Sequence, residues 1–229
     1  MIIDVLYNAV NVVLNKDQRG KLSPFDFNNV ANQAVNSVFD RLFDVYRRAI
    51  TRRNKFNYGA GLADDTKFTK QAIEFYEEEK VFDLKNGELV LDKTIMFVDG
   101  VFADNVVVTA SELKTFNALT RTKRMMPSLC SPIYTNHNGV LKTSPKLNKL
   151  SLSFIRRPKP AKWTYNIVSN LPLFNPSAPD FSDVDIHPSM VDELFKEILL
   201  LSGVHLKDLE SVQVINALKQ AQDQSKPSV

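Results

Sequence analysis

The chain of 229 residues is long enough for one large domain or for two to three smaller units around a shared core. Its 44% apolar and 24% charged residues are typical of folded globular proteins and exclude a chain that is mainly disordered or fibrous. The formal net charge is only +3, and the sequence has neither a glycine-rich phosphate-binding motif nor a run of 18 apolar residues, which argues against a nucleotide-binding fold and a membrane-spanning helix.

The first third of the chain has the three- and four-residue apolar spacing of helices. Residues 2–14 predict an amphipathic helix. Ser23 followed by Pro24 is typical of a helix cap and a first helical residue, so a longer second helix is expected to begin there. A third helix is expected from Asp64 into the acidic run that ends at Lys80. Acidic residues at the end of a helix oppose its dipole, which indicates a basic neighbour or a solvated face.

From residue 81 onward the pattern becomes extended, and turn residues separate short apolar runs. The Asn-Gly pairs at residues 86–87 and 138–139 predict two hairpins with type I′ turns, because both central positions of such a turn need a positive φ. An Asp-Gly pair at residues 99–100 predicts a further turn between two strands. Residues 111–119 predict a short helix.

The strand expected at residues 150–155 alternates between apolar and polar side chains and adds to a mostly antiparallel sheet. It ends in the basic sequence RRPKP, whose prolines fix φ and remove backbone donors, so the chain is expected to leave the edge of the sheet there. Trp163 follows as a large anchor that we expect to be buried. The proline-rich residues 171–183 predict an irregular connection.

The C-terminal part predicts two helices that close the fold. The first covers residues 188–203, with His187 or Ser189 near its cap and Gly203 as the residue that ends it. The second is expected to begin at Leu206 and to lead into a polar tail that is disordered in a monomer.

Together these elements predict an α+β fold in three successive parts. Residues 1–80 are expected to form a helical, bundle-like part. Residues 81–180 are expected to form a mostly antiparallel β region, and residues 181–229 the closing helices and the tail.

Charge is strongly segregated along the chain. Residues 113–179 contain eleven Lys and Arg and no Asp or Glu, whereas residues 59–112 carry a net charge of −7 and residues 180–229 a net charge of −5. Such blocks indicate internal complementarity, contacts between copies of the chain, or binding to nucleic acid. The charge pattern alone does not select among these three.

Twelve residues are candidates for contacts with a neighbouring subunit or with DNA. The expected second helix ends in more cations than its dipole needs, and the acid-free block supplies the others together with the only tryptophan. The candidates are Arg47, Arg48, Arg52, Arg53, Arg121, Lys123, Arg124, Arg156, Arg157, Lys159, Lys162 and Trp163.

No constellation of residues predicts an active site or a metal site. Cys130 has no histidine near it in sequence, and the three histidines lack metal-ligand spacing. Asp180, Asp183 and Asp185 alternate as in an Asp-rich cation loop, but the glycine and the distal glutamate of an EF-hand are missing. The sequence therefore predicts a protein that is not an enzyme and that needs no cofactor.

Two passages resemble a family of virion proteins. One is PIYTNHNGVLKTSPKLNKLSLSFIRRPKPAKWTYN, which begins at Pro132, and the other is DFSDVDIHPSMVDELFKEILLLSGVHLKD, which begins at Asp180. Together they resemble the head-to-tail connector, or neck, ring proteins of crAss-like tailed bacteriophages. The resemblance covers residues 136–208, and the N-terminal half is similar only in its helical style.

The resemblance implies a structural adaptor. Copies of the chain would form a ring, a dodecamer if it matches the portal, around the DNA channel in the neck of the virion, after assembly in the host cytoplasm. The portal protein and other neck or tail proteins would be its partners, with non-specific contact to packaged DNA and no membrane contact. Two alternatives remain open, namely a nucleic-acid-binding protein without sequence specificity and another structural component of the tail or capsid.

Overall fold

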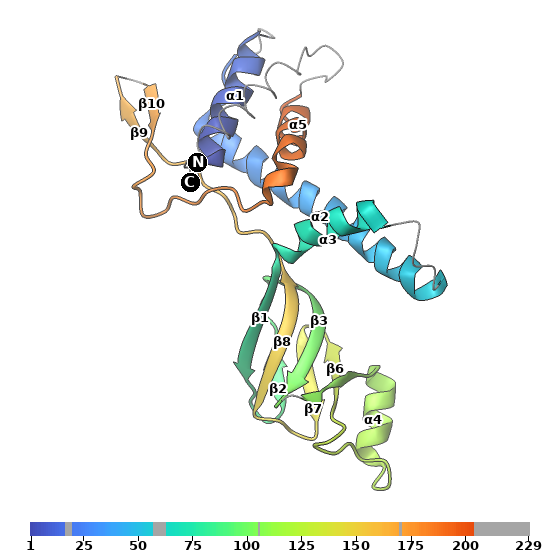
Figure 1. Ribbon diagram of the computed structural model, residues 1–229. Coiled ribbons are helices and arrows are strands. Elements are labelled where there is room, and N and C mark those ends of the chain that lie inside the picture. Colours follow the sequence, from blue (N-terminus) through green and yellow to red (C-terminus); the bar gives the residue numbers. More distant parts are fainter. Residues whose placement is uncertain (17–19, 57–62, 105, 170, 204–229) are drawn as a thin grey trace, which may run out of the picture. The chain divides into compact units, whose positions relative to one another are not determined.

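Helices and strands both make up a large part of the protein, which confirms the α+β class (Figure 1). The computed structural model describes residues 1–16, 20–56, 63–104, 106–169 and 171–203, and within them the side chains of residues 49–56 and 63–68 are not described. The elements are α1 (Ile2–Lys16), α2 (Pro24–Phe56), α3 (Ala63–Glu74), β1 (Glu77–Asp83), β2 (Glu88–Val90), β3 (Ile95–Ala103), β4 (Val106–Val107), β5 (Thr109–Ala110), α4 (Leu113–Arg121), β6 (Ile133–His137), β7 (Val140–Ser144), β8 (Lys149–Arg156), β9 (Tyr165–Val168), β10 (Leu171–Phe174), the 3₁₀ helix η1 (Pro188–Met190) and α5 (Val191–Leu201).

The chain divides into two compact units. A helical unit combines Met1–Phe75 with Pro158–Val229, and a β unit consists of Tyr76–Arg157. These boundaries differ from the expected linear division at residues 80 and 180. The reason is that the polypeptide leaves the helical unit once, completes the β unit, and returns to the helical unit after Arg157.

The core of the helical unit is formed by the apolar faces of α1, α2 and α5 together with the extended segment around Trp163. As predicted, α2 begins at Pro24, and the hydroxyl oxygen of Ser23 accepts a hydrogen bond from the backbone N–H of Asp26 at 3.2 Å. His187 caps the C-terminal helical segment, because its Nδ1 accepts a hydrogen bond from the backbone N–H of Ser189 at 3.3 Å. Gly203 follows α5 with a φ of +82° and ends it, also as predicted.

One expectation for the helical unit is wrong. The proline-rich connection does not begin as irregular chain, because residues 171–174 form β10 and pair with β9 in an antiparallel hairpin. Proline is compatible with this strand because the hairpin has only two strands, so β10 has an edge where no donor is needed. The helix expected from Leu206 and the polar tail lie outside the described residues.

The β unit contains two four-stranded sheets that share one apolar core. Their strand orders are β1-β8-β3-β4 and β2-β7-β6-β5, and all pairings are antiparallel except that of β5 with β6. The core draws side chains from both sheets, including Val101 of β3, Leu141 of β7 and Leu152 of β8. The predicted helix at residues 111–119 is confirmed as α4, which contacts β6.

The acidic run that was expected to end the third helix instead lies on strand β1. Helix α3 stops at Glu74, and all seven residues of β1 then pair with β8, from Glu77 opposite Ile155 to Asp83 opposite Lys149. The helix dipole therefore does not act on these carboxylates. Strand pairing with a distant segment outweighs the helical spacing that continues up to Tyr76.

Both predicted Asn-Gly turns are confirmed by positive φ values at residues 86–87 and 138–139. The second joins β6 to β7 in a hairpin. The first closes only a bridge between Lys85 and Glu88, because β1 and β2 pair with different sheets. The predicted Asp-Gly turn at residues 99–100 is wrong, since β3 runs through it with a register shift between Val98 and Gly100.

Strand β8 is an inner strand, between β1 and β3, so the expected exit at a sheet edge is wrong for this strand. The basic sequence RRPKP instead begins within this paired strand, and the backbone N–H of Arg157 still donates to the carbonyl of Thr94 at 2.8 Å. Arg156, the first arginine of this sequence, therefore belongs to the sheet.

Candidate assembly and nucleic-acid interfaces

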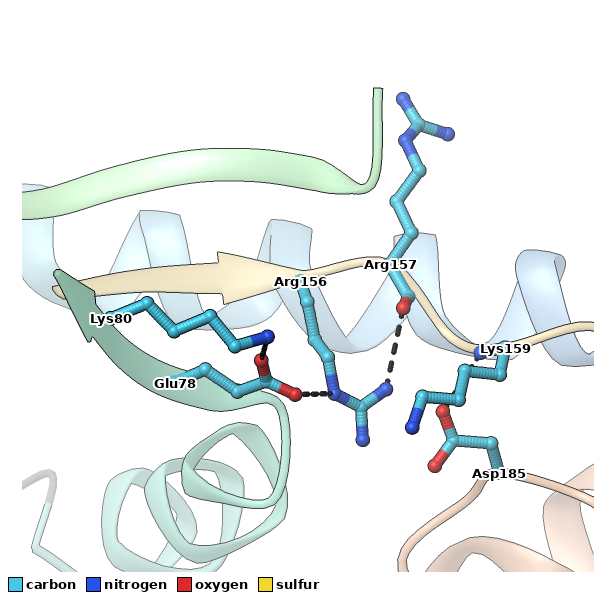
Figure 2. Close-up of polar contacts among 6 residues, drawn as sticks. All are labelled: Glu78, Lys80, Arg156, Arg157, Lys159 and Asp185. Atoms are coloured by element: carbon cyan, nitrogen blue, oxygen red, sulfur yellow. Dashed lines mark hydrogen bonds and ion pairs between the residues drawn. The ribbon is translucent and has the colours of Figure 1, made fainter. Parts of the chain in front are cut away.

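Three of the twelve candidates are already paired with carboxylates within the chain. Arg47 lies 3.6 Å from Asp44 on the exposed side of α2, and Lys162 pairs with Asp180. Arg156 pairs with Glu78, with 2.8 Å between its Nε and the carboxylate oxygen Oε1 (Figure 2). Cations with partners of this kind are weaker candidates for an external anion, because binding it would require the internal pair to be broken.

Arg156 is part of the β unit rather than of a free surface. Its side chain is only 13% exposed, and its guanidinium lies over the ring of Tyr76 at 5.5 Å from the centroid. Glu78 is also bound by Lys80, and these two cations, Lys80 first, hold the pKa of the Glu78 carboxyl below its ordinary value. The basic neighbour expected for the acidic run is therefore present, on the adjacent strand.

Trp163 lies in the core of the helical unit, as predicted. It is 2% exposed, and its ring stacks on Tyr7 at a centroid distance of 4.0 Å. Its indole N–H donates to the carboxylate of Asp4 at 3.0 Å. The side chain is thus a core residue of this unit, and it is not available as an interface anchor.

Two asparagines of α2 hold the extended segment that contains Trp163. The side-chain amide of Asn28 donates to the carbonyl of Trp163 at 3.1 Å and accepts from its N–H at 2.7 Å. Asn32 makes the same pair of bonds with Ala161, at 2.9 Å and 2.7 Å. Four residues of helix rise about 6 Å and two residues of extended chain about 6.6 Å, so the two spacings match. This contact could not be predicted, because nothing in the sequence relates α2 to residues 161–163.

The aspartates considered as a cation loop have structural roles instead. The carboxylate of Asp183 accepts from the N–H groups of Ile2 and Ile3, at 3.1 Å and 2.8 Å, and so caps the start of α1. Asp185 accepts from the N–H of Lys159 at 2.8 Å, and Asp180 pairs with Lys162. Among the described residues, no group of three or more His, Cys, Asp or Glu is arranged to hold a metal ion.

Five other candidates are exposed and make no ion pair within the described part of the chain. Arg121, Lys123 and Arg124 follow one another at the end of α4, and Arg157 and Lys159 lie beside the prolines after β8. Exposed Arg48 lies on α2, and the side chains of Arg52 and Arg53 are among those not described. The structure therefore separates one cluster of three cations on α4 from the paired cations.

An open groove of about 440 Å³ lies next to this cluster in the β unit. Its walls come from the end of α4, the turn before β2, and the connection between β7 and β8. Lys142 and Lys146 are on its rim with Glu88, whose carboxylate lies 2.8 Å from the Lys142 ammonium. Met126 also lines the groove, and its side chain is exposed.

The β9–β10 hairpin exposes apolar side chains to a degree that sequence analysis did not anticipate. Ile167 is 71% exposed, and Val168, Leu171 and Leu173 are each more than half exposed. Only its base is covered, where Phe174 stacks with Trp163 at a centroid distance of 5.9 Å. The signal in the sequence that could have indicated this uncharged element is the absence of any charged residue from 163 to 179.

The segregated charge is partly explained by internal complementarity. The acidic and basic blocks meet where β1 pairs with β8 and where β2 pairs with β7, and the ion pairs of Glu78 with Arg156 and of Glu88 with Lys142 lie there. Among the candidates in the basic block, this leaves the cluster at the end of α4, together with Arg157 and Lys159, without an ion pair to the described acidic residues.

No family model matches the chain, and a search of curated proteins finds no match. Within the described residues, no helix has the length and apolar character needed to cross a membrane.

Proposed function

We propose that the protein is a virion structural subunit, a head-to-tail connector ring protein in the neck of a tailed bacteriophage. The observation that carries the proposal is the β9–β10 hairpin, an uncharged element that exposes apolar side chains. The resemblance of residues 136–208 to connector proteins gives the kind of assembly, with the portal and the tail as its neighbours.

An isolated two-stranded hairpin is at best marginally stable in water, so a hairpin with apolar side chains in solvent is expected to have a partner. Burying the exposed half of four such side chains would contribute about 1 kcal/mol each, or about 4 kcal/mol per hairpin. In a closed ring this gain recurs at every subunit contact. A weak contact in a pair of copies is thus sufficient for a stable ring.

A ring requires a heterologous contact, in which one surface of a copy meets a different surface of the next. The hairpin suits such a contact because residues 163–179 carry no charge and can approach either an acidic or a basic surface without repulsion. The covered base of the hairpin, at Phe174 and Trp163, would hold it in a defined orientation.

The test is assembly of variants that make the hairpin polar without changing the core. Ile167→Asp and Leu173→Asp should fold normally but should fail to form rings with the portal, as judged by light scattering and electron microscopy. Phe25→Asp is the matched control, because Phe25 is 71% exposed at the start of α2. Normal ring formation by both hairpin variants would refute the proposal.

A further inference from the structure

We infer that the end of α4 binds the phosphate backbone of DNA without reading its sequence. The site consists of Arg121, Lys123 and Arg124, called here the α4 basic cluster, with Lys146 on the rim of the adjacent groove. The inference does not rest on the ring, because it concerns a surface that each copy of the chain carries within its own β unit.

The cluster has more positive charge than the fold requires. Arg121 is in the last turn of α4, where a single cation is enough to complement the helix dipole. Lys123 and Arg124 lie just beyond the C-cap residue Thr122 and are exposed, and none of the three cations forms an ion pair with the described residues. No Asp or Glu occurs in residues 113–179, so the surrounding sequence cannot neutralise them either.

The groove extends the positive surface from α4 to the connection between β7 and β8. Thr120 and Met126, on either side of the cluster in sequence, line the groove together with Lys142 and Lys146. Glu88 is the only carboxylate in its lining, and this group is held by Lys142 at 2.8 Å. An anion in the groove would therefore meet the ammonium group of Lys146 with little acidic opposition, whereas the Thr120 hydroxyl already donates to the carbonyl of Phe116 at 2.9 Å.

The chemistry of the site indicates contacts to phosphate rather than to bases. Stacking with unpaired bases requires an exposed aromatic face. Phe116 is the only aromatic side chain that lines the groove, and it is buried. Flexible exposed Lys and Arg side chains position a protein on the DNA backbone and carry no sequence information by themselves.

The experiment measures binding of the full chain to a short mixed-sequence DNA duplex over a series of salt concentrations. The variant carries Arg121→Gln, Lys123→Gln and Arg124→Gln. The slope of log affinity against log salt is negative, and each lost phosphate contact reduces its magnitude by about 0.9. The three substitutions together should therefore reduce its magnitude by about 2.7. At about 0.1 M salt the affinity should fall by about 10²- to 10³-fold.

The matched control removes three cations that are already paired, by Arg47→Gln, Lys70→Gln and Lys162→Gln. It has the same net charge as the cluster variant, but it should retain the wild-type salt slope. The single variant Lys146→Gln should lower the slope by about 0.9. Circular dichroism of each variant checks that it is folded.

Three outcomes would overturn the inference: no DNA binding by the wild-type chain at low salt, an unchanged slope in the cluster variant, or an equal loss of slope in the control. An equal loss would mean that net charge, and not this site, attracts DNA. None of these outcomes affects ring formation, so failure of this inference and failure of the proposed function can be told apart.

Discussion

The contact between α2 and the segment around Trp163 predicts that alanine at either of two asparagines of α2 lowers the free energy of unfolding, although alanine favours a helix. The Asn28→Ala variant loses two hydrogen bonds to the backbone of Trp163, and the Asn32→Ala variant loses two to the backbone of Ala161. Both partners are almost fully buried, at 2% and 3% exposure, so water cannot easily replace the lost bonds.

The expected magnitude follows from two opposing effects. Two hydrogen bonds contribute about 1–3 kcal/mol in net terms, and leaving buried backbone groups unpaired places the loss toward the upper end. Alanine is a better helix former than asparagine by about 0.5 kcal/mol, which offsets a small part of the loss. Each variant should therefore lower the free energy of unfolding by about 1–2.5 kcal/mol.

The assay is urea denaturation of each variant, followed by the fluorescence of the single tryptophan and by circular dichroism. The fluorescence reports on the helical unit, where Trp163 lies. Asn29→Ala and Asn36→Ala are matched controls, because these asparagines are exposed on the same helix, and these variants should be slightly stabilised. The reasoning is refuted if Asn28→Ala and Asn32→Ala are as stable as these controls.

Two further predictions concern single residues. Trp163→Ala should lower the free energy of unfolding by about 3–5 kcal/mol as a core truncation, whereas Trp163→Phe keeps the stacking and should cost about 1–2 kcal/mol for the lost bond to Asp4. Circular dichroism in urea measures both variants, and a Trp163→Phe variant as stable as the wild type would contradict the role of that bond. The pKa of Glu78 is lowered from its ordinary 4.5 in the folded state by Lys80 and then by Arg156, so its contribution to stability is present above that value and is lost as the pH falls through the folded pKa. The stability difference between the wild type and Glu78→Gln should therefore shrink below about pH 4.5, and a difference independent of pH would count against the ion pair.

Local signals in the sequence predicted local structure well. The cap at Ser23, the turn at residues 138–139 and the helix end at Gly203 each depend on a few neighbouring residues, and all three are confirmed. Burial of Trp163 was also predictable, because a single large apolar side chain in a mixed chain is rarely left in water.

The errors occur where a distant segment decides the structure. The acidic run became β1 because β8, more than 70 residues later, pairs with it. The register of β3 on β8 likewise turned an expected turn at residues 99–100 into an irregularity within a strand, where a side chain in place of Gly100 would lie 2.8 Å from the ring of Phe102. Such pairings are invisible to periodicity and turn rules.

The candidate interface residues could be named from the sequence but not ranked. Charge counting treats Arg156 and Arg124 alike, although one is held by Glu78 and the other has no acidic partner in the described chain. The exposed β9–β10 hairpin was overlooked because its proline and asparagine residues resemble those of an irregular loop.

The most direct test of the proposed function is electron microscopy of the protein assembled with its portal. We predict a closed ring in which the β9–β10 hairpin of each copy lies against the next copy, with Ile167 and Leu173 buried at the contact. A ring in which these two side chains remain in solvent, or a neck that does not contain the protein, would contradict the proposal.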